Sequence, residues 1–181
     1  MNYKLTSDLT TRNLKASQGL SLIELLVTLS IISILLCVGL PSFTKSIDKN
    51  RIQSATYDLL TAIQTTRQLA VTRQMRAVLR ANNQWHDGWE LFVDTNDNGK
   101  RETDEQLLFS QPGIPLSMLA NTNSMKTISF INTGESRQAK GSAGGSFLAG
   151  SISICDKSGH SGYKLILARG GRTRISKISC P

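Results

Sequence analysis

The chain has 181 residues, of which 39% are hydrophobic and 19% are charged, and its formal net charge is +8. This length suits one domain with an accessory segment, and it is enough to bury a modest hydrophobic core. The excess of positive charge indicates affinity for phosphate-rich partners or for an anionic membrane surface, but it says nothing about the fold.

The N-terminus divides into a polar segment and an apolar one. Residues 1–19 are polar and carry more basic than acidic side chains, and residues 20–40 carry Glu24 as their only charge. A run of about 20 apolar residues is long enough to span a bilayer as a helix. The basic leader predicts that its own side stays cytoplasmic while the rest of the chain is exported. No small-residue cleavage site follows Leu40, which argues against an ordinary signal peptide.

Glu24 is unusual, because a carboxylate inside a membrane helix is costly unless it finds a partner. If the chain were cut between Gly19 and Leu20, Glu24 would be the fifth residue and would lie one turn from a new positive amine. The amine of a neighbouring subunit could then neutralise this carboxylate during assembly. The alternative interpretation is an ordinary membrane anchor that happens to contain one acid.

The stretch "QGLSLIELLVTLSIISILLCVGLPSF", residues 18–43, resembles the signature of type IV pilins and type II secretion pseudopilins. The matching residues are Gly19, Leu20, Glu24 and Pro41, although Phe is more usual where this chain has Leu20. The resemblance implies that a prepilin peptidase cleaves after Gly19 and N-methylates Leu20. It also implies a single-pass protein of the bacterial inner membrane, with a periplasmic domain, that assembles with other pilins into a pilus.

The rest of the chain predicts a helix followed by strands. The helical pattern continues over residues 41–75, and Pro41 is expected to kink this helix rather than to end it. Its expected core face consists of Ile47, Ile52, Ala55, Leu59, Ile63 and Ala70. Residues 76–181 read as a β-rich domain, with candidate strands at 77–81, 89–94, 106–110, 127–131, 146–155, 163–169 and 173–179. The predicted class is α+β, with the long helix packed on antiparallel sheets as in the type IV pilin-like fold.

Four further segments narrow the resemblance to the FimT/GspH family of minor pilins and pseudopilins. They are "RQLAVTR" at 67–73, "GWELFVDTNDNG" at 88–99, "ISFINTGES" at 128–136 and "GGRTRI" at 170–175. Together with the N-terminal signature, these segments extend the resemblance over nearly the whole chain after Gly19, and they favour the FimT branch.

Two features of the sequence bear on metal binding and catalysis. Residues 94–105 have the spacing of a calcium loop, but the flanking segments read as strands and Asn98-Gly99 is a strong turn signal. Turn formation is the favoured interpretation, and calcium binding stays open. The chain contains only two histidines, His86 and His160, and neither belongs to a nucleophile or metal-ligand motif. We therefore expect a non-enzymatic protein with no cofactor and no metal.

Export would place Cys155 and Cys180 in an oxidising compartment, where a disulfide between them is expected. Two unpaired thiols are the alternative. A bridge would fix the last predicted strand against the sheet. Cys37, within the apolar run, is expected to be a small packing residue.

The C-terminus is basic and free of acids from Lys157 onward. On a strand, Arg172 and Arg174 would share one face about 7 Å apart, which matches the spacing of successive phosphates along DNA. The alternative is an edge strand kept soluble by its charge. The candidate DNA-binding residues are Lys164, Arg169, Gly171, Arg172, Arg174 and Lys177.

The resemblance to the FimT branch implies a function for these residues, because Gly171 to Arg174 fit a Gly-Arg-x-Arg element associated with DNA binding in natural transformation. Contacts to phosphate with little base stacking predict binding of double-stranded DNA without sequence preference. The alternative function is that of a structural pseudopilin in a type II secretion or pilus-assembly system, with no role in DNA binding.

Overall fold

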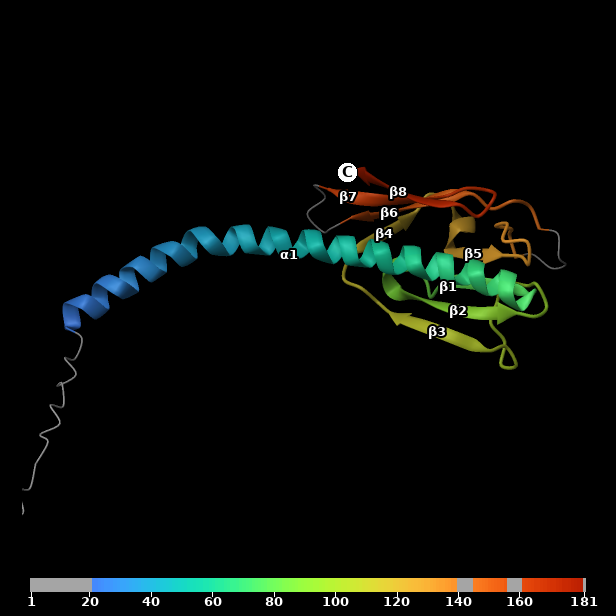
Figure 1. Cartoon of the computed structure of the whole chain (residues 1–181), viewed down its shortest axis with the longest axis horizontal. Coiled ribbons are helices and arrows are strands. Elements are labelled where there is room, and N and C mark those ends of the chain that lie inside the picture. Colours follow the sequence, from blue (N-terminus) through green and yellow to red (C-terminus); the bar gives the residue numbers. More distant parts are fainter. Residues whose placement is uncertain (1–20, 140–144, 156–160, 181) are drawn as a thin grey trace, which may run out of the picture. The chain divides into compact units, whose positions relative to one another are not determined.

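The computed structural model describes residues 21–139, 145–155 and 161–180, with backbone alone at 38–45, 120, 123 and 124 (Figure 1). The predicted leader, 1–19, and the predicted processing residues Gly19 and Leu20 lie outside the described residues. A single helix, α1 (Leu22–Arg73), precedes the strands and continues through Pro41. The chain forms two compact units, Met1–Phe43 and Thr44–Pro181, which are described separately.

The first unit contains the N-terminal part of α1, with Glu24 in its first turn. The large apolar side chains from Leu22 to Leu36 are all at least half exposed. Cys37 has a free thiol and is exposed. Within the described residues, no helix combines the length and the apolar character needed to cross a membrane.

The second unit contains two antiparallel sheets of four strands. The first has the order β3-β2-β1-β5 and is formed by β1 (Arg76–Ala81), β2 (Gly88–Asp94), β3 (Leu107–Pro112) and β5 (Thr127–Phe130). The second has the order β4-β6-β7-β8 and is formed by β4 (Ser117–Ala120), β6 (Gly150–Cys155), β7 (Gly162–Leu167) and β8 (Thr173–Ile178). Two short 3-10 helices, Trp85–Asp87 and Asn123–Lys126, lie between strands. The predicted α+β class with helix on antiparallel sheets is confirmed.

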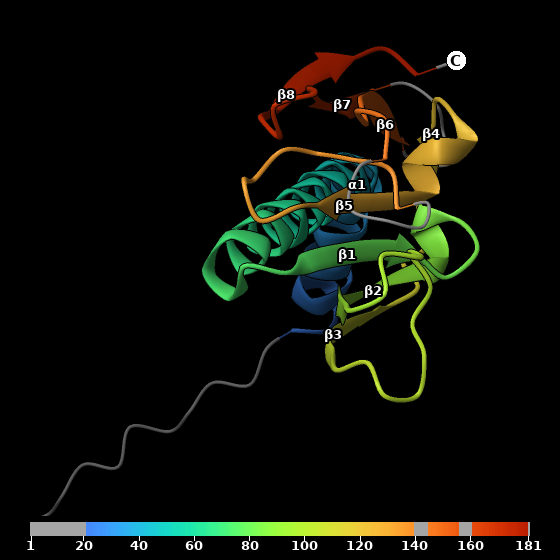
Figure 2. The same cartoon turned by 90° about the vertical axis from the view of Figure 1, so that its right-hand side faces the viewer.

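The C-terminal part of α1 and both sheets share one hydrophobic core (Figure 2). From the helix it includes Leu59 and Ile63, from the first sheet Leu79, and from the second sheet Leu165 and Leu167, all of which are buried. Because successive strand residues alternate between faces, the core takes every second residue of β7 and leaves the others on the outer surface. This alternation decides which face of the sheet presents each basic side chain.

Four details of the predicted elements differ from the structure. The helix ends at Arg73 rather than 75, because Gln74 takes a positive φ of 54°. Ile47 is 44% exposed, since it precedes the first core residue of the helix. β4 (Ser117–Ala120) was not predicted. The strand expected over 146–155 begins at Gly150, because Ser146 and Leu148 instead hydrogen-bond to the backbone of Gln138 and Ser136.

Candidate functional site

The predicted basic element forms the β7–β8 hairpin, and β8 is an edge strand of the second sheet. Arg169 lies in the connecting turn, and Arg172 directly precedes β8. Arg169, Arg172, Arg174 and Lys177 are exposed, and Lys164 is partly exposed. The hairpin therefore presents five basic side chains on a regular scaffold.

The strand register divides these side chains between two faces. Arg174 pairs with Ile166, and Arg172 and Arg174 line a surface hollow of about 230 Å³ together with Ile166 and Ala168. Lys164, two residues from Ile166 along β7, belongs to the same outer face. Arg172 and Arg174 thus share a face, as their spacing predicts.

Lys177 belongs to the opposite face of β8. It pairs with Tyr163 and lines a separate hollow of about 160 Å³ with Lys49 and Ile52 of α1. The two sides of the edge strand are therefore both basic, but no single flat surface contains all five side chains.

The turn between β7 and β8 depends on Gly171. The amide of Gly171 donates to the carbonyl of Ala168, and the amide of Ala168 donates to the carbonyl of Arg172, both at 2.9 Å. Gly171 has a φ of +78°, as the left-handed residue that closes a three-residue hairpin loop does. A Cβ there would lie 2.3 Å from the carbonyl oxygen of Gly134. Gly171 is buried, so its backbone packs closely against the protein and not against a ligand. Its role is to set the conformation of the turn.

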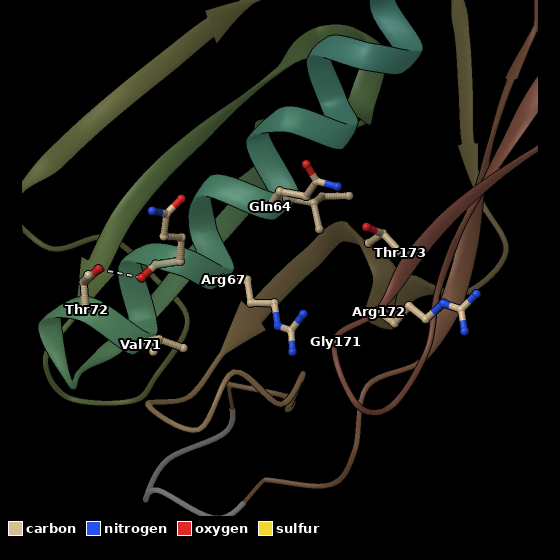
Figure 3. Close-up of a pocket in the computed structure, with 9 residues that line it drawn as sticks. Gln64, Arg67, Val71, Thr72, Gly171, Arg172 and Thr173 are labelled. Atoms are coloured by element: carbon tan, nitrogen blue, oxygen red, sulfur yellow. Dashed lines mark hydrogen bonds between the residues drawn. The ribbon is translucent and has the colours of Figure 1, made fainter.

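Two side chains outside the hairpin hold its tip in place. The side chain of Arg67 extends from α1 beside the hairpin turn that contains Gly171 (Figure 3). It donates from Nε to the carbonyl of Gly134 at 2.9 Å and from an Nη to the carbonyl of Gly170 at 3.4 Å. Ser136, which is fully buried, donates from its amide to the carbonyl of Arg169 at 3.3 Å, and its Oγ lies within hydrogen-bonding distance of the carbonyls of Leu148, Ala168 and Arg169, at 2.7, 3.0 and 3.1 Å. Nothing in the local sequence of Arg67 indicates these contacts with distant residues.

The basic side chains of the hairpin lie apart from the carboxylates of the described residues. Within the described residues, no carboxylate lies within salt-bridge distance of Lys164, Arg169, Arg172, Arg174 or Lys177, and none of the five donates a side-chain hydrogen bond to that part of the protein. Their charge is therefore available to a partner.

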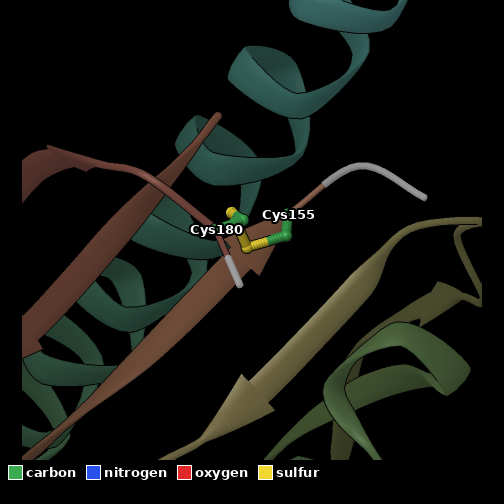
Figure 4. Close-up of a disulfide and its surroundings, with 2 residues drawn as sticks. All are labelled: Cys155 and Cys180. Atoms are coloured by element: carbon green, nitrogen blue, oxygen red, sulfur yellow. A yellow bond between two sulfur atoms is a disulfide. The ribbon is translucent and has the colours of Figure 1, made fainter. Parts of the chain in front are cut away.

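The predicted pairing of Cys155 and Cys180 is confirmed (Figure 4). The two residues form a disulfide with a Cα–Cα distance of 6.1 Å, and this bond joins the end of β6 to the segment that follows β8. The bridge and the contacts of Arg67 thus fix β8 at both ends.

The loop 94–105 uses its carboxylates internally. Asp94 accepts hydrogen bonds from the amides of Asn98 and Gly99, at 3.1 and 2.8 Å, and Glu105 accepts from the amides of Thr95 and Glu102, at 2.8 and 3.1 Å. Burial raises the pKa of Asp94 above its ordinary value of 3.8, and the hydrogen bonds from the Gly99 and Asn98 amides oppose this shift. These are the contacts of a structured turn. Among the described residues, no group of three or more potential metal ligands is found.

Comparisons with known proteins agree with this architecture. The family described as "Type II transport protein GspH" matches residues 55–171, and the "Prokaryotic N-terminal methylation motif" matches residues 14–36. No curated protein matched the chain.

Two crystal forms of the type IV minor pilin FimU from Pseudomonas aeruginosa (strain PAO1) share the fold, each with 18% sequence identity and a TM-score of 0.52. The first covers 68% of this chain and 91% of FimU, and the second covers 71% and 90%. The chain belongs to the GspH family, the family of type IV minor pilins and type II secretion pseudopilins that its sequence motifs predict.

Proposed function

We propose that this chain is a minor type IV pilin that binds double-stranded DNA without sequence preference and supports DNA uptake in natural transformation. The observation that carries the proposal is the β7–β8 hairpin, whose five basic side chains have no acidic partner among the described residues. Unpaired charge that served only to keep an edge strand soluble would not need a turn contacted by Arg67, through Gly170, and by Ser136, through Arg169. A pre-formed basic surface is instead what binding to an anionic partner requires.

Phosphate is the chemistry that these side chains fit best. Arg172 and Arg174 line one hollow, and guanidinium groups bind phosphate oxygens through two parallel hydrogen bonds. Lys164 adds charge on the same face, and Arg169 adds it at the tip. Because Tyr163 lies on the other face and no aromatic residue lines the hollow, the contacts would be to the DNA backbone rather than to bases.

The first unit supports an anchored, assembled protein. The match to the N-terminal methylation motif includes Gly19, Leu20 and Glu24, so we propose cleavage after Gly19 by a prepilin peptidase and N-methylation of Leu20. The exposed apolar side chains from Leu22 to Leu36 need an apolar environment, which the inner membrane or the core of a pilus would provide. Glu24 would then find a subunit's N-terminal amine as its partner.

The proposal is tested by titrating DNA with the full chain in non-ionic detergent and following complex formation by gel shift. We expect salt-sensitive binding to unrelated duplexes, and the variant Arg172→Gln/Arg174→Gln should lose most of it. Lys100→Gln/Lys126→Gln is the matched control, because it removes the same net charge from outside the hairpin. Equal loss in both variants would mean that net charge, and not this hairpin, determines binding.

A structural role is the second candidate, and the match to type II transport protein GspH favours it. In this case the chain would bind other pilins or pseudopilins only. The wild-type chain would then fail to shift DNA at low salt, where nonspecific phosphate contacts are strongest.

A further inference from the structure

A groove of about 510 Å³ lies between α1 and the tip of the β7–β8 hairpin, on the opposite side of the tip from the Arg172 guanidinium (Figure 3). The helix contributes Gln64, Arg67 and Val71 to its lining, and the hairpin contributes Gly171, Arg172 and Thr173. Its size lies within the range of small-ligand sites, roughly 300–1,000 Å³. The groove belongs entirely to the second unit.

The groove has the chemistry to hold a flat, polar ring. Gln64 and Thr173 point toward each other across it, from the helix and the hairpin (Figure 3). Among the described residues, neither of their side chains is engaged in a hydrogen bond. An amide and a hydroxyl together can both donate and accept, as the edge of a nucleobase requires. Val71, which is 42% exposed, adds apolar surface against which a ring can pack.

Arg67 adds a cation at this groove. Its Nε and one Nη contact the carbonyls of Gly134 and Gly170, and within the described residues the other Nη has no protein partner. The guanidinium is thus held in place beside the turn that contains Arg172, and the N–H groups of its other Nη can donate to a ligand. A guanidinium held in this way can stack on a base or bind a phosphate.

The cations near the hairpin tip lie on two sides of it, and this arrangement distinguishes between forms of DNA. Arg172 points away from α1 in Figure 3, and Arg172 and Arg174 line the outer hollow, whereas Arg67 lies on the helix side of the tip. A duplex is stiff over about 150 base pairs and cannot bend around a single hairpin tip. An unpaired strand can follow both surfaces.

We propose that the groove between α1 and the hairpin is a subsite for an unpaired nucleotide at the end of a DNA strand. The duplex part contacts Arg172 and Arg174 on the outer face, and the unpaired end passes over the tip, where Arg67, Gln64 and Thr173 receive it. This inference rests on the proposed DNA-binding function and makes it specific to ends with single-stranded overhangs.

The test compares two DNA probes: a blunt-ended duplex, and the same duplex with a three-nucleotide single-stranded overhang. Binding of each probe to the full chain in detergent is followed by fluorescence anisotropy. The wild type should bind the overhang about fivefold tighter, the factor expected for one net hydrogen bond of ordinary strength. Gln64→Leu should remove this advantage and leave blunt-duplex binding unchanged. Gln53→Leu, the same change at an exposed helix position that does not line the groove, should keep it.

Three results would overturn the inference, and they are distinguishable. Equal affinity of the wild type for both probes would contradict the subsite while leaving the proposed function intact. An overhang preference that survives in Gln64→Leu would place the unpaired nucleotide elsewhere. Absence of binding to either probe would contradict both the inference and the proposed function.

Discussion

The loop between Asp94 and Glu105 and the β7–β8 hairpin are both rich in charge, and they use it differently. In the loop, Asp94 and Glu105 are 2% and 4% exposed, and their carboxylates accept hydrogen bonds from backbone amides. Asp97 of the loop forms an ion pair with Arg76 of β1, with 2.6 Å between Oδ1 and Nε. In the hairpin the basic side chains are exposed or partly exposed, and among the described residues none has an acidic partner.

This difference indicates what each charge is for. A buried carboxylate or guanidinium that lost its partner would destabilise the fold, so the charges of the loop have structural consequences. The hairpin owes its shape to the disulfide, to Gly171 and to contacts from Arg67, none of which uses its own basic side chains. Its charges can therefore be exchanged without loss of the fold, as a binding surface requires.

The largest expected effect on stability concerns the bridge that holds the hairpin. Replacing both cysteines in Cys155→Ser/Cys180→Ser should lower the free energy of unfolding by about 3 kcal/mol, because a closed chain loop restricts the unfolded state. Urea unfolding followed by circular dichroism measures it. A loss below about 1 kcal/mol would mean that the hairpin is held by its other contacts alone.

The next effect separates structural from free charge. Asp97→Ala leaves the guanidinium of Arg76 buried without its carboxylate, and we expect a loss of about 2–3 kcal/mol. Arg172→Ala, at an exposed cation without a partner in the described part of the chain, should change stability by less than about 0.5 kcal/mol. Urea unfolding measures the free energy of unfolding of both variants. Equal losses would contradict the distinction between the paired charges of the loop and the unpaired charges of the hairpin.

Adjacent glycines of the hairpin turn provide a third test. Gly171→Ala should cost about 2 kcal/mol, since its left-handed backbone disfavours a side chain and the new Cβ would meet the carbonyl of Gly134. At Gly170, a Cβ would meet no atom within 4 Å, and the φ is not positive. Gly170→Ala should therefore be nearly neutral in thermal unfolding. The account of the turn is wrong if the two variants unfold at the same temperature.

The smallest effect is a pH dependence that originates in the loop. Because the pKa of Asp94 is raised on folding, the folded state binds this proton more tightly than the unfolded state does. Its contribution to stability is present below pH 3.8 and decreases as pH rises through the higher folded pKa. Relative to Asp94→Asn, the wild type should lose stability over this window, measured by urea unfolding at several pH values. A relative gain with rising pH would reverse the sign of the predicted shift.

Much of the fold follows from local patterns in the sequence. The period of Ile52, Ala55, Leu59 and Ile63 predicts the helix face that is buried, and alternation predicts seven of the strands. β4 was missed because Ser117–Ala120 is a short strand whose place in the sheet depends on pairing with β6, which no local pattern encodes.

The candidate site was predictable only in part. The spacing of Arg172 and Arg174 predicts that they share a face, and export predicts the disulfide that is present. The role of Arg67 depends on contacts with residues 67 and 103 positions away, Gly134 and Gly170, so no local signal could reveal it. The separation of Lys177 from Arg174 follows from their odd spacing on a strand, but only the packed structure shows that the face with Lys177 is the one that meets α1.

The measurement that tests the central claim most directly is the salt dependence of DNA binding by the full chain. The logarithm of the binding constant should fall linearly with the logarithm of salt concentration, by about 0.9 for each phosphate contacted. In Arg172→Gln/Arg174→Gln this slope should become shallower by about 2, because two phosphate contacts are lost. An unchanged slope in the variant would contradict the assignment of phosphate binding to these two side chains.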